Sequence, residues 1–211
     1  MKLTWIGHSC FKIEKNGYSI VVDPYTAGSV PGLDAVNVSA NQVLCSHEHG
    51  DHNGRAEVEL IESNAMENPF RIEVIETYHD EVCGAKRGTN KIFIISDGKQ
   101  RVAHFGDLGC ELPEDQMNRL KGLDAALIPV GGYYTIDGRQ AADLMVALKP
   151  RIVIPMHFRD DAAGFGYDVI DTAGMFTEKM DSVMTLPVSE IDTEDEQRAK
   201  VVVLQPLRRQ A

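Results

Sequence analysis

The chain has 211 residues, of which 43% are hydrophobic and 25% are charged. This composition is typical of a globular protein with a buried core, so it excludes collagen-like, low-complexity and wholly disordered chains, and the length predicts a single domain over residues 1–211. The 32 acidic residues outnumber the 21 basic ones and give a formal net charge of −11, which would repel a phosphate backbone and makes nucleic acid an unexpected partner.

The first half of the chain is predicted to form mainly strands, and the second half to alternate strands with helices. Strands are expected at residues 2–6, 11–14, 18–22, 41–45, 70–77, 91–96 and 101–105, and then at 125–130, 151–156 and 201–204. Helices are expected at residues 113–120, 137–148 and 170–180. Five acidic residues between 190 and 196, without a compensating base, predict a solvated loop. This order of elements predicts stacked β-sheets with helices outside them.

The N-terminal segment and the cysteines indicate where the protein works. Residues 1–11 lack the long apolar run of a signal peptide, and no apolar stretch approaches the roughly 18 residues that would span a bilayer. We therefore expect a soluble, cytoplasmic protein without a membrane partner. The four cysteines form no Cys-x-x-Cys pair, which excludes a zinc ribbon or a thioredoxin motif.

Three of the seven histidines lie within six residues, in the segment His47-x-His49-x-Asp51-His52. Imidazole and carboxylate groups are common ligands of zinc-like ions, and alternation along an extended segment points His47 and His49 the same way. Asp51 and His52 follow Gly50 and would face a second position. A polar surface loop with incidental histidines is the alternative, but so dense a cluster of ligand-type side chains favours a metal site.

The same pattern, directly after a predicted strand, resembles the hallmark of the metallo-β-lactamase-fold superfamily. The resemblance implies an α/β fold, a four-layer αββα sandwich of two mixed β-sheets with helices on the outer faces. It also implies three further metal ligands, each where a predicted strand ends: His79, Asp107 and His157. One ion would take His47, His49 and His79, the other would take Asp51, His52 and His157, and Asp107 would bridge them.

This ligand set implies two divalent ions that share a hydroxide, which acts as the nucleophile. Zinc is the first expectation, with manganese or iron as alternatives. Asp51 and Asp107 would be the catalytic carboxylates. His8, at the tip of a predicted hairpin, would contact the substrate or donate a proton to the leaving group; the alternative is a turn histidine bonded to backbone.

Departures from other branches narrow the expected activity. Asp107 stands where the best-known antibiotic-hydrolysing subclass has cysteine, and His49 stands where flavodiiron proteins have glutamate, so neither activity is favoured. Segments 7–11, 87–90, 131–137 and 154–158 resemble the compact ascorbate-6-phosphate-lactonase-like hydrolases. The resemblance implies a dinuclear metal-dependent hydrolase that cleaves an ester, lactone or phosphoester bond of a small, anionic metabolite.

Two other functions stay open at this point. The same metal pair could serve a nuclease or a cyclic-nucleotide phosphodiesterase, although the acidic surface argues against RNA binding. A non-catalytic metal-binding or ligand-sensing module would keep the site for stability rather than turnover. The sequence is compatible with a homo-oligomer as well as with a monomer.

Several residues near the predicted ligands have alternative roles. His104 could orient a ligand or lie exposed on its strand. The resemblance implies that Asp23 braces the metal loop through backbone hydrogen bonds without being a ligand. Tyr133 or Tyr134 could cover the pocket as part of a flexible lip; plain loop packing is the alternative. Four basic residues could meet a substrate anion or be solvated surface charges: Lys86, Arg87, Lys91 and Arg159.

Overall fold

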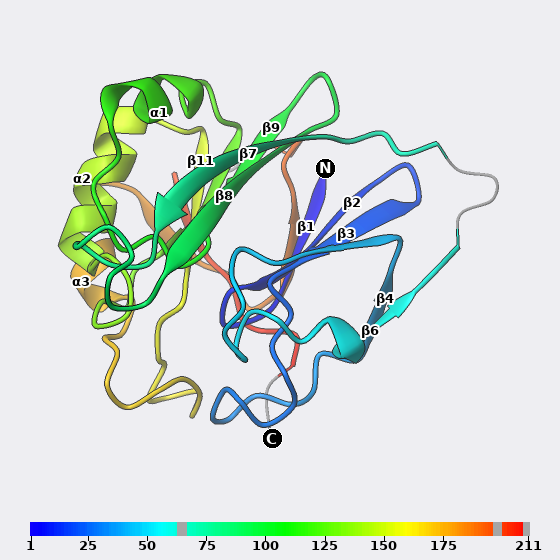
Figure 1. The fold of residues 1–211 in the computed structure, drawn as a ribbon, viewed down its shortest axis with the longest axis horizontal. Coiled ribbons are helices and arrows are strands. Elements are labelled where there is room, and N and C mark those ends of the chain that lie inside the picture. The colour runs from blue at the N-terminus through cyan, green and yellow to red at the C-terminus, as the bar shows by residue number, and fades with distance from the viewer. Residues whose placement is uncertain (63–66, 196–199, 209–211) are drawn as a thin grey trace.

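The computed structural model describes residues 1–62, 67–195 and 200–208 (Figure 1). Its strands are β1 (Lys2–Gly7), β2 (Cys10–Lys15), β3 (Tyr18–Val22), β4 (Val38–Ala40), β5 (Gln42–Leu44), β6 (Val58–Leu60), β7 (Arg71–Tyr78), β8 (Thr89–Ser96), β9 (Arg101–His104), β10 (Ala125–Pro129), β11 (Ile152–Met156), β12 (Val183–Thr185), β13 (Glu190–Asp192) and β14 (Val201–Val203). Its helices are the 3₁₀ turn η1 (Arg55–Glu57) and the α-helices α1 (Glu114–Arg119), α2 (Gly138–Leu148) and α3 (Gly174–Thr177).

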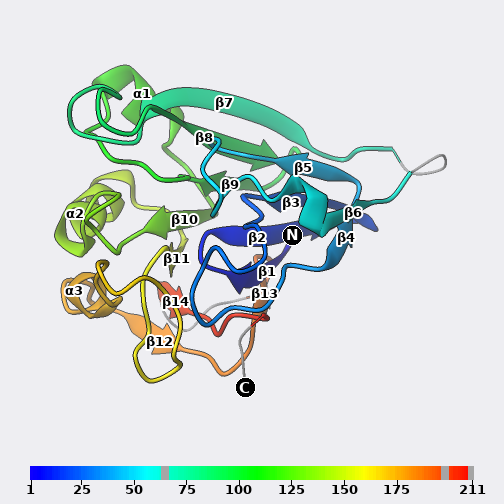
Figure 2. The same ribbon diagram turned by 60° about the horizontal axis from the view of Figure 1, so that its bottom comes forward.

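Two mixed sheets make up most of the fold. One has the order β13-β1-β2-β3-β5, and the other has the order β12-β14-β11-β10-β9-β8-β7, while β4 and β6 form a separate pair. The three α-helices of the described residues lie beside the seven-stranded sheet, on the side away from the five-stranded one (Figure 2). Buried side chains of both sheets belong to one continuous hydrophobic cluster. The predicted α/β sandwich of two mixed sheets is confirmed, but the α-helices of the described residues cover only the seven-stranded sheet and not both outer faces as expected.

The ten predicted strands are all present, with bounds that differ by at most two residues. Turn chemistry explains this accuracy. Asn16 and Gly17 both have positive φ, +52° and +84°, as the two-residue turn between β2 and β3 requires. Helix α2 is also confirmed: Asp137 caps it by accepting hydrogen bonds from the backbone N–H groups of Arg139 and Gln140, both at 2.9 Å.

Two predicted elements are corrected. Glu190 and Asp192 were expected in a solvated loop, but they belong to β13, which pairs antiparallel with β1. Ile191 between them packs into the core, so the alternation that defines a strand is present within the acidic run. Glu196, the last acid of that run, lies outside the described residues. The predicted helix at 170–180 contracts to the single turn α3, Gly174–Thr177, and the N-cap residue before it, Ala173, gives no side-chain cap.

Strand direction places the chemistry-bearing loops together. Strands β1, β3 and β5 run the same way in the five-stranded sheet, because β1 and β3 are each antiparallel to β2 and β3 is parallel to β5. By the same reasoning β7, β9 and β11 run the same way in the seven-stranded sheet. The loops that follow these strands therefore leave each sheet at the same end of its strands.

The described part of the chain contains no helix with the length and apolarity to cross a bilayer.

Candidate metal centre

Each predicted metal ligand follows one of these strands. The segment His47–His52 follows β5, His79 follows β7, Asp107 lies three residues beyond β9, and His157 directly follows β11. The structure brings all seven predicted ligands together. Within the described residues, the ligand atoms of three groups lie within 4.8 Å of one another: His8, Asp51, His52 and His157; His47, His49 and His79; and His47, His52 and Asp107.

Asp107 lies at the centre of this cluster. Its Oδ1 is 3.1 Å from Nε2 of His52, and its Oδ2 is 3.3 Å from Nε2 of His79 and 3.3 Å from Nε2 of His157. Nε2 of His47 is 3.8 Å from the same Oδ2. Imidazoles from both predicted ligand groups therefore meet at the two oxygens of a single buried carboxylate. This is the arrangement expected of a carboxylate that two cations share.

A chain of hydrogen bonds fixes which nitrogen of two histidines faces Asp107. The Ser46 hydroxyl donates to Oδ2 of Asp23 at 2.6 Å, so it can only accept from Nδ1 of His47 at 2.9 Å. Nδ1 of His52 donates to the same Asp23 oxygen at 2.8 Å. In the neutral rings the Nε2 atoms of His47 and His52 then carry lone pairs. Asp23 and Ser46 thus prepare both histidines as ligands.

Buried polar atoms without hydrogen-bond partners support metal binding. Among the described residues these include Nε2 of His47, His52 and His157, together with Oδ1 of Asp107. A buried donor or acceptor without a partner costs about 1–3 kcal/mol. These nitrogen and oxygen atoms lie close to one another and are of the types that bind metals. A zinc-like divalent cation among them would therefore satisfy them together. The residues present therefore fit the metals that the sequence predicts.

The electrostatics of the metal-free cluster also favour a cation. Burial disfavours the charged form of His52, but Asp107, Asp23 and Asp51 outweigh it and raise its pKa well above the usual value. Burial also opposes ionisation of Asp107, yet His157 and His52 hold its pKa well below the usual range. Burial lowers the pKa of His47 to about 3. The carboxylates around His52 thus favour its protonated form, and a metal ion would have to displace that proton, so metal binding should release protons.

The predicted bracing role of Asp23 agrees with its geometry. Its carboxylate is fully buried and accepts a hydrogen bond from the backbone N–H of Ser46 at 2.6 Å, in addition to the side-chain bonds described above. His104 is also fully buried, so the exposed alternative for this residue is wrong. Its Nδ1 accepts from the N–H of Gly106 at 3.1 Å, and its Nε2 lies 2.8 Å from the carbonyl oxygen of Ser9. His104 thus ties the loop after β9 to the β1–β2 turn.

Asn90, which had no predicted role, positions Asp107. Its Oδ1 accepts from the backbone N–H of Asp107 at 2.9 Å, while its Nδ2 donates to the carbonyl of Phe105 and the hydroxyl of Thr77. Gly106 lies against it with φ of +55°, and a Cβ there would be 2.3 Å from Oδ1 of Asn90. Only glycine fits this close approach. The turn that presents Asp107 therefore requires glycine at position 106.

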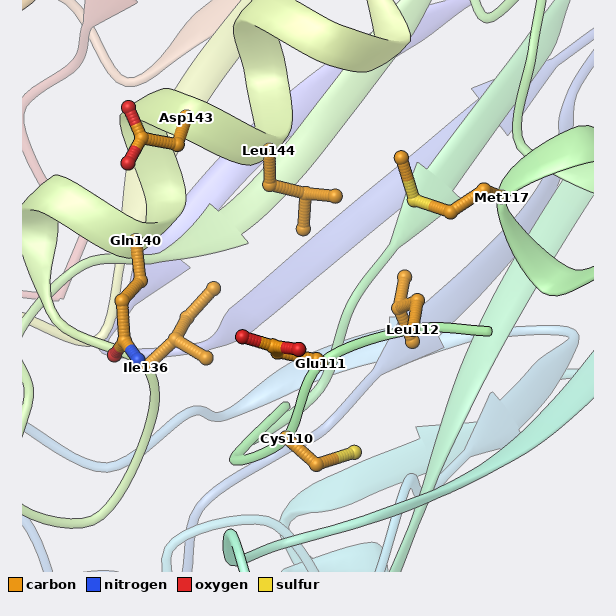
Figure 3. Close-up of a pocket in the computed structure, with 8 residues that line it drawn as sticks. All are labelled: Cys110, Glu111, Leu112, Met117, Ile136, Gln140, Asp143 and Leu144. Atoms are coloured by element: carbon orange, nitrogen blue, oxygen red, sulfur yellow. The ribbon is translucent and has the colours of Figure 1, made fainter. Parts of the chain in front are cut away.

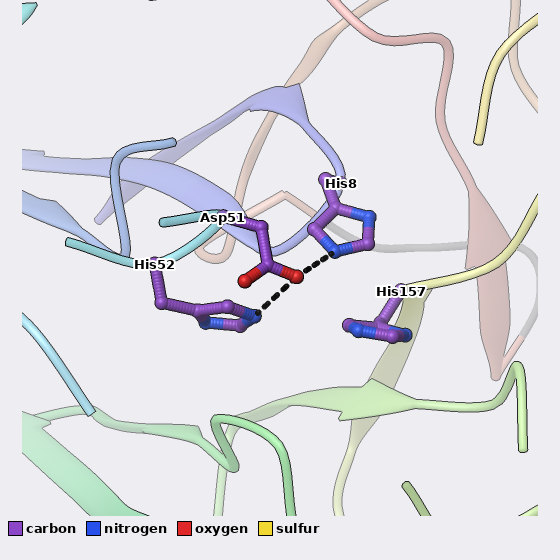
Figure 4. A group of neighbouring side chains, drawn as sticks. All are labelled: His8, Asp51, His52 and His157. Carbon is purple, nitrogen blue, oxygen red and sulfur yellow. Dashed lines mark hydrogen bonds and ion pairs between the residues drawn. The ribbon is translucent and has the colours of Figure 1, made fainter. Parts of the chain in front are cut away.

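His8 reaches the cluster from the turn between β1 and β2 (Figure 4). Its Nε2 is 3.3 Å from Oδ2 of Asp51, and its ring centroid is 4.1 Å from that of His157. Burial lowers the pKa of His8 to about 4. Burial opposes ionisation of Asp51 too, but His52 and His8 lower its pKa. The predicted turn position of His8 is correct, and its side chain faces the ligands.

A pocket of about 300 Å³ opens over the cluster. It is lined by His49, Asp51, His79, Arg87, Asp107, Tyr134 and Tyr167. Of the two tyrosines expected at its lip, Tyr134 lines it, while Tyr133 is 64% exposed beside it. Lys86, Lys91 and Arg159 are not among the lining residues; Lys86 pairs with Glu81, and Arg159 pairs with Asp161.

Tyr167 was not predicted from the sequence. Its hydroxyl donates to the carbonyl oxygen of Ser29 at 2.8 Å, and its ring packs edge-on against His8 at 5.6 Å. It lies ten residues after His157 in a segment without strand or helix periodicity, so no sequence pattern marks it.

A second cavity, also of about 300 Å³, lies between α1, α2 and the segment that follows Asp107 (Figure 3). Its walls combine apolar and acidic side chains: Cys110, Glu111, Leu112, Met117, Ile136, Gln140, Asp143 and Leu144. No histidine lines it, so it is separate from the candidate metal centre.

A two-sheet sandwich with histidines and aspartates gathered at one edge defines a class of metal-binding α/β protein. Within that class, the chain belongs to the metallo-β-lactamase superfamily: residues 2–157 match the model of the beta-lactamase superfamily domain. The resemblance inferred from the histidine motif is therefore confirmed.

Similar proteins are metal-dependent hydrolases. One from Desulforamulus reducens is 29% identical over 192 residues, which cover 75% of this chain and 84% of the relative. Another, from Hyperthermus butylicus, is 25% identical over 244 residues, which cover 96% of this chain and 95% of the relative. A solved structure from Thermotoga maritima, assigned as a zinc-dependent hydrolase of the metallo-β-lactamase superfamily, has 28% identity and a TM-score of 0.72, with 96% of this chain and 97% of that one covered.

Proposed function

We propose that the chain is a dinuclear metal-dependent hydrolase that cleaves an ester, lactone or phosphoester bond in a small metabolite. The observation that carries this proposal is Asp107, whose two oxygens lie within 3.8 Å of four imidazoles from two ligand groups. His47, His49 and His79 would hold one ion, and Asp51, His52 and His157 the other. Zinc is the expected metal, as for the Thermotoga maritima structure, with manganese and iron as alternatives.

When bound, two divalent ions at such a site lower the pKa of a water molecule and stabilise negative charge on the reacting group. Residues of the chain would supply the remaining steps. Asp107 and Asp51 neutralise part of the added positive charge. His8, whose Nε2 lies 3.3 Å from Asp51, has a pKa lowered to about 4 by burial, so its resting ring is neutral. It would take up the proton released by the attacking water and pass that proton to the leaving oxygen, and Asp51 would orient the ring.

The pocket supports a small substrate. Its volume of about 300 Å³ is at the lower end of the range for ligand sites. Tyr134 and Tyr167 form its aromatic walls, with ring centroids 6.1 Å apart. Together they would keep bulk water away from the reacting bond. The dimensions and the acidic chain favour a metabolite over a polymer.

Metal analysis and two substitutions test this proposal. Metal-replete protein should contain two equivalents of zinc, manganese or iron. Asp107→Ala removes the shared carboxylate and His52→Ala removes one imidazole, so each should reduce hydrolysis of a chromogenic ester or phosphodiester at least 100-fold. Circular dichroism should show that both variants are folded. Asp143→Ala, on the exposed face of α2, is the matched control and should retain wild-type turnover.

Two results would overturn the proposal. Less than one equivalent of metal after metal-replete purification would exclude the dinuclear site. Full activity in both Asp107→Ala and His52→Ala would place the chemistry elsewhere.

A further inference from the structure

Arg87 lies on a loop whose shape is fixed next to a metal ligand. Asp80, which follows His79, accepts hydrogen bonds from four backbone N–H groups of that loop: Val82 at 3.0 Å, Gly84 at 2.8 Å, Lys86 at 3.0 Å and Arg87 at 2.7 Å. The loop closes with the N–H of His79 donating to the carbonyl of Gly88 at 3.0 Å. The backbone position of Arg87 is thus set relative to His79.

The Arg87 guanidinium is held by aromatic rings rather than by a carboxylate. It lies 5.5 Å from the ring centroid of Tyr134 and 5.9 Å from that of Tyr133, both within cation–π range. Across the described residues, no carboxylate comes within 4.0 Å of it, whereas the adjacent Lys86 is paired with Glu81. An arginine without an ion pair is notable in a chain of net charge −11.

Arg87 is also the only lysine or arginine among the described residues that line the metal pocket. The two carboxylates of that pocket are already engaged. Asp51 contacts His8 and His52, and Asp107 contacts four imidazoles. Neither carboxylate is available to neutralise Arg87. Arg87 as a whole residue is partly buried, and its side chain lines the pocket.

We propose that Arg87, braced by Tyr133 and Tyr134, is an anion subsite that binds a carboxylate or phosphate group of the substrate. The proposal rests on the proposed hydrolase function and names its substrate class: esters, lactones or phosphoesters that carry a further negative group away from the bond that is cleaved. A planar guanidinium binds such groups through two parallel N–H donors, and stacking on tyrosine leaves its edge free to do so.

The test compares two esters that differ in one charge. Metal-loaded full-length protein is assayed with 4-nitrophenyl butyrate and with the mono-4-nitrophenyl ester of glutarate. Arg87→Gln should reduce the ratio of kcat/KM for the anionic ester to that for the neutral ester about 10- to 100-fold, which is the size expected for a charge-assisted hydrogen bond. Arg87→Lys should recover part of the ratio. Lys86→Gln, on the same loop, should leave the ratio at the wild-type value.

Binding provides a readout that does not need turnover. In zinc-loaded protein, titration with glutarate or with inorganic phosphate should shift the Nε–H resonance of Arg87 in a nitrogen–proton correlation spectrum. A shift with glutarate alone identifies a carboxylate as the bound group, and a shift with phosphate alone identifies a phosphate. Arg87→Gln lacks this resonance, so its binding of the same anion is measured by calorimetric titration and should be about 10- to 100-fold weaker.

The outcomes separate this proposal from the hydrolase proposal. An unchanged ester ratio in Arg87→Gln, with both esters hydrolysed, overturns the anion subsite and leaves the hydrolase intact. If the anion shifts the Nε–H resonance of Arg87 but the protein hydrolyses neither ester, the result supports the subsite and counts against the hydrolase. No shift with either anion overturns the subsite whatever the activity.

Discussion

At the scale of single residues, the geometry of the candidate metal centre depends on side chains outside the predicted ligand set. Asp23 accepts from Ser46 and His52, and through Ser46 it also fixes His47. Asp23→Asn replaces one acceptor oxygen with a donor, so at least one buried N–H or O–H group loses its partner. We expect the free energy of unfolding to fall by about 1–3 kcal/mol and metal affinity to fall about 10- to 100-fold.

Urea denaturation and competition with a chelator measure the two effects of Asp23→Asn. Asp143→Asn, an exposed aspartate in α2, is the control and should change neither quantity. Wild-type metal affinity in Asp23→Asn would mean that Asp23 only shapes the loop.

The sequence predicted which histidines and aspartates gather at one site because several of them are concentrated and chemically distinctive. His47, His49, Asp51 and His52 lie within six residues, and a cluster of this kind has few structural explanations. Asn90 and Tyr167 could not be found in the same way. Asn90 acts through the backbone of a residue 17 positions away, and that contact exists only because β8 pairs with β9. Long-range pairing of this type has no local sequence signal.

At the scale of elements, turn and capping residues separated the accurate predictions from the inaccurate ones. Helix α2 has a capping box at Asp137 and Gln140 and ends at Lys149 in the left-handed region, so its bounds were predictable. The predicted helix at 170–180 has no comparable cap, and only α3 forms. Strand β13 was missed because its three residues carry two acids, and charge is a poor guide to an edge strand.

The assignment of β13 to the sheet can be tested at Ile191. Ile191 pairs with Leu3 of β1 and is 8% exposed. Ile191→Asp would place a carboxylate in the core and should lower the free energy of unfolding by about 2–4 kcal/mol in urea denaturation. Val188→Asp, at an exposed position just before β13, should change stability by less than about 0.5 kcal/mol. Equal stability of the two variants would mean that this segment is the solvated loop predicted from its charge and not a strand of the sheet.

At the scale of the whole molecule, metal binding should control stability as well as activity. Ligands come from loops after β5, β7, β9 and β11, so ions bound among them would connect the two sheets. Binding to the folded state alone, at a free metal concentration 100 times the dissociation constant, adds about 2.7 kcal/mol per site. For a chain of this length that corresponds to a Tm increase of about 5–11 °C per site.

Thermal melts in solutions buffered at different free metal concentrations test this linkage. Repeating the melts at different pH values tests whether protons compete with the metal. The histidines must be deprotonated to bind a metal, and the carboxylates around His52 raise its pKa, so protons compete with the ions. The metal-dependent part of Tm should therefore shrink as the pH falls from 8 to 5.5. Asp107→Ala should lose most of it at every pH. A Tm that is independent of free metal in the wild-type chain would mean that the sheets hold the cluster together without ions.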